Sequence, residues 1–131
     1  MGFKIKNPNP CKCLVGDCVV RAISIAENKD WQDIYIDLCT QGLLQCDMPS
    51  SNSVWQSYLQ RVGYFLRMVP NEYPNGISVK KFTEIYPRGI FVLGTGEHAI
   101  AVINGTYYDT WDSGDEIIMF YLAKKRQQVI T

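Results

Sequence analysis

The spacing of apolar residues changes near residue 90 of the chain. Before this point apolar residues recur at the three- and four-residue spacing of helices, and after it they follow the period of two that is typical of strands. The sequence therefore predicts a proline-rich extended start, a helical part over about 17–86 and a sheet over about 90–123. The predicted helices cover 18–27, 30–42, 53–62 and a short segment after Ser78, the predicted loops cover 46–51 and 70–76, and the predicted strands cover 64–69, 90–93, 98–103, 106–111 and 116–122.

The predicted helix at 18–27 is apolar around nearly its whole circumference. Only Arg21, Ser24 and Asn28 line up as a narrow polar stripe. A helix of this kind is buried on all sides. Asp17 is expected to cap its first turn, so Cys18 is predicted to stand at the N-terminus of a buried helix.

The dipeptide Asn104-Gly105 stands between two strand-like runs and predicts a hairpin with a type I′ turn, whose two central residues need positive φ angles. A two-residue turn fixes the register of the two strands and hence which residues share a face. His98 and Asp109 fall on one face, diagonally opposite each other, whereas Asp112 falls on the other face. A slip of one residue would exchange the two carboxylates. We therefore predict Asp109 as the partner of His98, within an antiparallel meander formed by the strands after residue 90.

The composition is that of a globular protein with one domain, which we assign to residues 1–131. Apolar residues make up 47% of the chain, and no apolar run reaches the roughly 20 residues of a membrane span. Thirteen basic residues balance 13 acidic ones, without the basic excess that nucleic-acid binding needs. The first residues do not have the pattern of a secretory signal. We therefore expect a cytoplasmic α+β protein that binds neither nucleic acid nor a membrane.

Five cysteines predict free thiols, because the number is odd and the expected compartment is reducing. The single residue between Cys11 and Cys13 is not the spacing of a zinc knuckle, although Cys18 follows closely. Cys39 continues an apolar helical face and is expected in the core. The fifth cysteine, Cys46, falls in a predicted loop. No metal or other cofactor is predicted.

Three residues, in order along the chain, have the types that a thiol hydrolase needs. Cys18 opens a helix, where the dipole favours a thiolate. His98 is the only histidine and takes the role of the base, while Asp109 would hold its ring in one tautomer. Each residue also has a structural interpretation, as a core cysteine, a hydrogen-bonded histidine on a strand and a carboxylate that bonds a loop. The catalytic hypothesis depends on the three together.

Several runs of the chain also carry a family resemblance. They are the run from Gly16 to Ile23, the pair Met48-Pro49 with the helix and Gly63-Tyr64 that follow, and the runs 98–102 and 108–113. Over about residues 11–120 the chain resembles small papain-like cysteine peptidase proteins encoded by bacteriophages, a largely uncharacterised family. The resemblance implies a papain-like fold, in which an N-terminal helical lobe with a buried nucleophile helix packs on a C-terminal antiparallel sheet. It also implies Cys18, His98 and Asp109 as a catalytic triad.

One feature of papain-like enzymes is absent from the sequence. These enzymes commonly have a glutamine a few residues before the nucleophile, and its side chain joins the nucleophile's own amide in the oxyanion hole. Here that window holds Cys11, Lys12 and Cys13. We expect the Cys18 amide as one donor, with Lys12, Asn9 or a donor from elsewhere as the second. Loss of one donor typically lowers turnover about 10²- to 10³-fold, so the difference bears on efficiency.

The sequence thus predicts a cysteine peptidase or thiol hydrolase that cleaves a peptide, isopeptide or related amide bond through an acyl-enzyme. Its substrate would be a protein or peptide and, for a phage product, a host protein in the host cell cytoplasm.

Two alternatives stay open. A peptidoglycan amidase is one, since Asp17-Cys18 matches an Asp-Cys nucleophile motif, but Val19-Val20 replaces the Ser-Gly that usually follows. The other is a phage-encoded binding or inhibitor protein on the same fold with a vestigial triad, anchored to its partner by exposed aromatic side chains. The candidate anchors, for which core packing is the competing expectation, are Trp55, Tyr64, Tyr73 and Tyr107.

Overall fold

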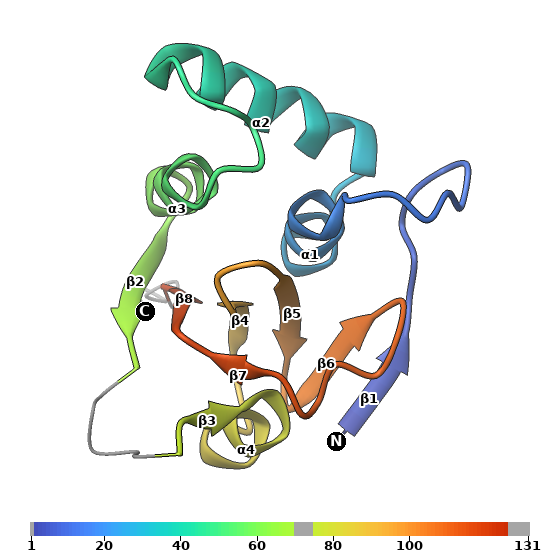
Figure 1. Ribbon diagram of the computed structural model, residues 1–131, viewed down its shortest axis with the longest axis vertical. Coiled ribbons are helices and arrows are strands. Elements are labelled where there is room, and N and C mark those ends of the chain that lie inside the picture. Colours follow the sequence, from blue (N-terminus) through green and yellow to red (C-terminus); the bar gives the residue numbers. More distant parts are fainter. Residues whose placement is uncertain (1, 70–74, 126–131) are drawn as a thin grey trace, which may run out of the picture.

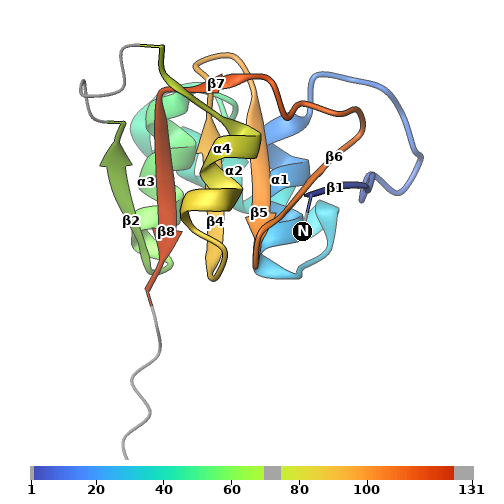
Figure 2. The ribbon, with the colours of Figure 1, turned by 90° about the horizontal axis from the view of Figure 1, so that it is seen from below.

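The computed structural model describes residues 2–69 and 75–125, and these form an α+β fold built around one mixed sheet. Helices cover both faces of this sheet (Figure 1, Figure 2). On one face lie α1 (Cys18–Glu27), α2 (Trp31–Gln45) and α3 (Asn52–Arg61). On the other lie α4 (Val79–Ile85) and a small sheet of β3 (Ile77–Ser78) with β7 (Ile117–Ile118).

Six strands form the main sheet, in the order β1-β6-β5-β4-β8-β2. They are β1 (Gly2–Ile5), β2 (Tyr64–Met68), β4 (Ile90–Gly94), β5 (Ala99–Ile103), β6 (Thr106–Asp109) and β8 (Phe120–Lys124). β1 runs parallel to β6, and the other neighbours are antiparallel.

The strands after residue 90 do not form the simple meander that the sequence predicts. The segment predicted as one strand at 116–122 is divided into β7 and β8, and β8 pairs with β4 instead of β6. The free edge of β6 is taken by β1, which lies in the segment predicted as an extended start. Hydrogen bonds in the loop after β6 turn the chain back across the sheet, with Asp112 accepting from the Gly114 amide and from the Tyr107 hydroxyl.

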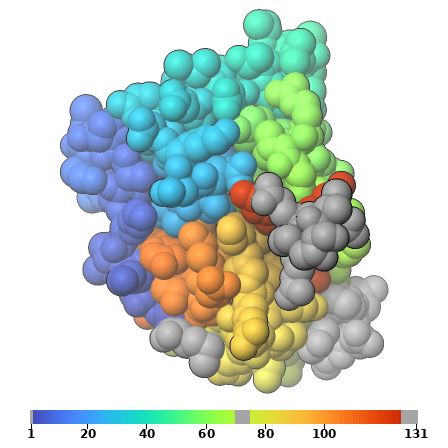
Figure 3. Space-filling model, turned by 180° about the vertical axis from the view of Figure 1, so that it is seen from behind, coloured from blue at the N-terminus to red at the C-terminus, as the bar shows by residue number. Residues whose placement is uncertain are grey.

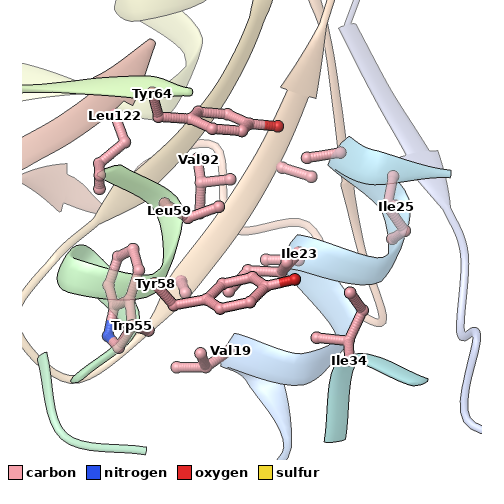
Figure 4. Close-up of a cluster of buried hydrophobic side chains, with 14 of the residues drawn as sticks. Val19, Ile23, Ile25, Ile34, Trp55, Tyr58, Leu59, Tyr64, Val92 and Leu122 are labelled. Atoms are coloured by element: carbon pink, nitrogen blue, oxygen red, sulfur yellow. The ribbon is translucent and has the colours of Figure 1, made fainter. Parts of the chain in front are cut away.

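Both faces of the central strands are buried, which explains their nearly continuous apolar sequence. Val92 and Ala101 pack into a core with α1, α2 and α3, while Leu93 and Ile100 pack into a second core with α4. Figure 4 shows the first core, where side chains from the three helices meet the sheet. Each large aliphatic side chain buried there contributes about 1.5–3 kcal/mol.

The helices agree closely with the predicted ranges. α1 begins at Cys18 as predicted and is buried on nearly all sides. α2 continues past Gly42 to Gln45, because this glycine serves close packing inside the helix and does not end it. A Cβ at Gly42 would lie 2.7 Å from the carbonyl oxygen of Asp47. Ser78 caps α4 as predicted, its side chain accepting a hydrogen bond of 3.1 Å from the Lys81 amide.

Most of the predicted loop 70–76 lies outside the described residues. Among the helices of residues 2–69 and 75–125, none is long and apolar enough to cross a membrane.

Candidate active site

The β5–β6 hairpin and the N-terminus of α1 bring the three candidate residues together. Asn104 and Gly105 have φ angles of 48° and 80°, as a type I′ turn requires, and Ala101 pairs with Tyr108 in the predicted register. His98 directly precedes β5 and Asp109 ends β6. The result is a hydrogen bond of 2.6 Å between His98 Nε2 and Asp109 Oδ2.

Cys18, the first residue of α1, faces the start of β5. Partial burial opposes ionisation of its thiol, but hydrogen bonding from His98 and from the Ala99 backbone amide outweighs this penalty. The positive charges of His98 and Arg21 act in the same direction. The pKa of the Cys18 thiol therefore lies below its ordinary value.

The histidine is shifted in the complementary direction. Burial disfavours the imidazolium, yet hydrogen bonds to Asp109 and Cys18 and their negative charges raise the pKa of His98 to about 9. Asp109 shows the same balance, because burial is outweighed by hydrogen bonds from His98 and Ser113, and the pKa of its carboxyl is lowered. Around neutral pH these shifts favour a thiolate beside an imidazolium.

Four groups surround the Asp109 carboxylate, whose side chain is only 2% exposed. His98 and the Ser113 hydroxyl, at 2.7 Å, contact Oδ2. The Thr110 amide, at 2.8 Å, and the Arg21 guanidinium, at 3.6 Å, contact Oδ1. Of the two carboxylates weighed from the sequence, Asp109 is the one that contacts His98, and Asp112 bonds elsewhere.

Asp17 stands at the predicted N-cap position, but its side chain makes no capping hydrogen bond, so this prediction is wrong. The carboxylate instead turns away from the helix amides into a polar cluster. It forms an ion pair with Arg21 and accepts hydrogen bonds from Trp31 Nε1 at 3.0 Å and Asn9 Nδ2 at 3.2 Å. Because its charge is compensated there, Asp17 does not oppose the thiolate as a free carboxylate would.

Both side chains expected as a second oxyanion donor have other partners. The Asn9 amide donates to Asp17, and the Lys12 ammonium donates to the Asn7 carbonyl at 2.6 Å. These contacts direct both groups to the segment before α1. The Cys18 amide belongs to the first turn of α1, whose amides have no acceptor within the helix.

Two adjoining hollows meet at Cys18 and His98, with volumes of about 250 and 420 Å³. Gly16 and Glu97 also line both. The first extends over 50–55 toward Trp55, and the second extends toward Val15 and Trp111. Trp111, whose ring centroid lies 5.3 Å from that of His98, forms one wall beside the imidazole. The thiol is thus open to a groove that runs to either side of it.

Three of the four aromatic residues considered as interface anchors are core residues. Trp55, Tyr64 and Tyr107 are 1%, 2% and 1% exposed, respectively. Their hydroxyl and indole groups are satisfied internally, as by the bond from Tyr64 to Glu27 at 2.8 Å. Tyr73 lies outside the described residues. Core packing, the competing expectation, is therefore confirmed for Trp55, Tyr64 and Tyr107, and the anchor role that the binding-protein alternative gives them is wrong.

All five cysteines are free thiols. Cys11, Cys13 and Cys46 are exposed, whereas Cys18 and Cys39 are half-buried. Cys39 is in neither of the two hydrophobic cores of the described residues, so its predicted core position is wrong. Within residues 2–69 and 75–125, no group of three or more His, Cys, Asp or Glu side chains is arranged to hold a metal ion.

Comparison with known proteins finds no relative of this chain. No family model, curated protein or solved structure matches the chain.

Arg21 and Ser113 are the residues of the site to which the sequence assigns no role. Ser113 follows Asp109 by four residues in a loop, and nothing in its sequence context indicates where it points. Arg21 does leave a signal, because it is a charged residue in the middle of a largely apolar helix, whose other charged residue, Glu27, is the last of the helix. A buried charge demands a partner, and this requirement points toward the carboxylates of the site.

Proposed function

We propose that this protein is a cysteine peptidase or related thiol hydrolase with a papain-like fold, in which Cys18 is the nucleophile, His98 the general acid and base, and Asp109 the orienting carboxylate. The observation that carries the proposal is the position of His98, which lines the same two hollows as Cys18 and is bonded through Nε2 to Asp109 Oδ2. The order of these residues and the nucleophile at the start of a buried helix agree with the family resemblance found in the sequence.

The reaction begins with attack of the Cys18 thiolate on the carbonyl carbon of a peptide, isopeptide or related amide. The carbonyl oxygen becomes an oxyanion, which the amide at the N-terminus of α1 is suited to stabilise. His98 then gives its proton to the amide nitrogen, the C–N bond breaks, and the amine leaves a thioester on Cys18. Asp109 keeps the imidazole oriented through this step.

Water completes the cycle. His98, now neutral, takes a proton from a water molecule as its oxygen attacks the thioester carbonyl. The C–S bond breaks, the carboxylic acid product leaves, and Cys18 and His98 return to thiolate and imidazolium. Every proton moves through His98 Nδ1, because Nε2 remains bonded to Asp109 Oδ2.

Rates of thiol alkylation test the proposal without knowledge of the substrate. The protein is treated with iodoacetamide across pH, and each cysteine peptide is followed by mass spectrometry. At about pH 6 we expect Cys18 to react at least about tenfold faster than Cys11 or Cys13, because the pKa of the Cys18 thiol is lowered. The two exposed thiols are controls within the same molecule, and equal rates for all three would contradict the proposal.

Cleavage of a mixed peptide library then tests turnover. New amino termini are expected with the wild type and are expected to disappear in Cys18→Ala. A library left uncut by a protein with a reactive Cys18 would restrict the substrate to isopeptides or other amides, which are tested next in the same way.

A further inference from the structure

Arg21 lies one helical turn after Cys18, inside the protein and between two carboxylates. Its side chain is 9% exposed. One guanidinium nitrogen pairs with Asp17, and the other lies 3.6 Å from Asp109 Oδ1. The guanidinium thus connects the segment before α1 with the end of β6.

The spacing of Cys18 and Arg21 along α1 places both side chains against the β5–β6 hairpin. Residues three apart on a helix are neighbours on its surface, so Cys18 and Arg21 both face the β5–β6 hairpin. Cys18 faces His98, and Arg21 faces Asp109. The helix and the hairpin therefore meet through two adjacent polar contacts in an otherwise apolar interface.

Charges alternate in sign from the segment before α1, through Arg21, to the candidate triad. Asp17 is negative, Arg21 positive and Asp109 negative, and they are followed by the His98 imidazolium and the Cys18 thiolate. The other groups packed around Asp17 and Asp109 are neutral donors, namely Asn9, Trp31, Ser113 and the Thr110 amide. Glu97 is the remaining charged residue of the groove, and it is exposed.

We propose that Arg21 is a positioning residue that holds the Asp109 carboxylate toward His98 and thereby sustains the reactive thiolate. This inference rests on the proposed function. Arg21 and the Thr110 amide hold Oδ1 while His98 and Ser113 occupy Oδ2, which opposes rotation of the carboxylate away from the imidazole. Asp17, fixed by Asn9 and Trp31, in turn keeps the guanidinium in place.

The test compares Arg21→Met, which removes the charge, with Arg21→Lys, which keeps it. Alkylation of Cys18 by iodoacetamide is measured across pH in each variant. We expect Arg21→Met to raise the pH of half-maximal reactivity by about one unit, which makes alkylation at about pH 6 roughly tenfold slower. Arg21→Lys is expected to restore at least about half of this shift. Arg88→Met, which changes an exposed arginine, is the matched control and is expected to behave as wild type.

A purely structural role for Arg21 would lower the melting temperature and leave the alkylation profile unchanged, and this result would overturn the inference. If Arg21→Met does not fold, the double variant Asp17→Asn/Arg21→Met, which leaves no unpaired charge at this ion pair, is expected to show the same shift. Failure of the proposed function is recognised separately, because wild-type Cys18 would then already react like an ordinary thiol.

Discussion

Cys18 and His98 are coupled, and the coupling determines how stability depends on pH. The pKa of His98 is raised to about 9, so alone it stabilises the fold below about pH 6.5, and this contribution is lost as pH rises toward 9. The pKa of Cys18 is lowered, so its contribution has the opposite slope in the same range. Where the folded protein holds Cys18 as thiolate and His98 as imidazolium, the folded pair carries one proton, as the unfolded pair does between about pH 6.5 and 9, and the two pH dependences cancel.

Cys18→Ala should remove this cancellation. We expect the stability of the variant to fall as the pH rises above about 6.5, by on the order of 2 kcal/mol, because His98 keeps Asp109 as a partner but loses the thiolate. Wild-type stability is expected to stay nearly constant over the same range. Chemical denaturation at several pH values measures both. Parallel curves for the two proteins would show that the residues are not coupled.

The sequence could predict those contacts of the site that join residues close together along the chain. The pairing of His98 with Asp109 follows from a two-residue turn, so it could be predicted. The role of Asp17 could not be predicted, because its partners Asn9 and Trp31 lie in segments that are brought close to Asp17 only by the whole fold. An N-cap preference is a small local effect, and a buried cluster with an arginine overrides it.

At the scale of elements, the sequence was sufficient to predict a helix or a hairpin when its limits depend only on its own residues. The all-apolar helix and the Asn104-Gly105 hairpin were predicted closely, because periodicity and turn chemistry are properties of short segments. The partner of β8 was not predicted. Whether β8 pairs with β4 or with β6 depends on β1, which takes the edge of β6 and lies more than 100 residues away in the sequence. The signal for β1 itself is only four residues long.

The pairing of β4 with β8 depends on a glycine. A Cβ at Gly94 would overlap the outer atoms of the Phe120 ring, which is packed against Trp55. We therefore expect Gly94→Ala to destabilise the protein by about 1–3 kcal/mol, measured by chemical denaturation.

Two variants control this prediction. Gly16→Ala, where a Cβ meets no atom within 4 Å, is expected to change stability little. In the double variant Gly94→Ala/Phe120→Leu, the smaller side chain relieves the overlap, so its loss should be about 1 kcal/mol less than the sum of the single changes. Simple additivity would mean that the ring is not what the added methyl group meets.

At the scale of the whole molecule, the site is supported by the N-terminal strand. β1 pairs with β6, and the Lys6 amide donates to the Asp109 carbonyl at 2.9 Å. Figure 3 shows the N-terminal segment along one flank of the molecule, beside the hairpin that carries the site. A segment with no catalytic side chain therefore holds the backbone of Asp109 in place.

Removal of residues 2–6 is accordingly expected to lower the melting temperature and to slow alkylation of Cys18 at about pH 6 by roughly threefold or more, since a less ordered Asp109 supports His98 less well. Ile5→Ala, which removes an exposed side chain and keeps the strand, serves as the comparison and should leave both values near those of the wild type. A truncated protein with an unchanged rate would show that β6 orders Asp109 without β1.

The separation of the three residues along the chain also bears on biosynthesis. A ribosome releases the Cys18 helix first, and 80 more residues must follow before His98 appears. β4 obtains its second neighbour only when β8 has emerged, close to residue 124. Domains fold as units during synthesis, so the nascent chain carries the Cys18 thiol without the His98 imidazole beside it until the strands through β8 have emerged. The Cys18 thiol is therefore expected to have ordinary reactivity until β8 joins the sheet.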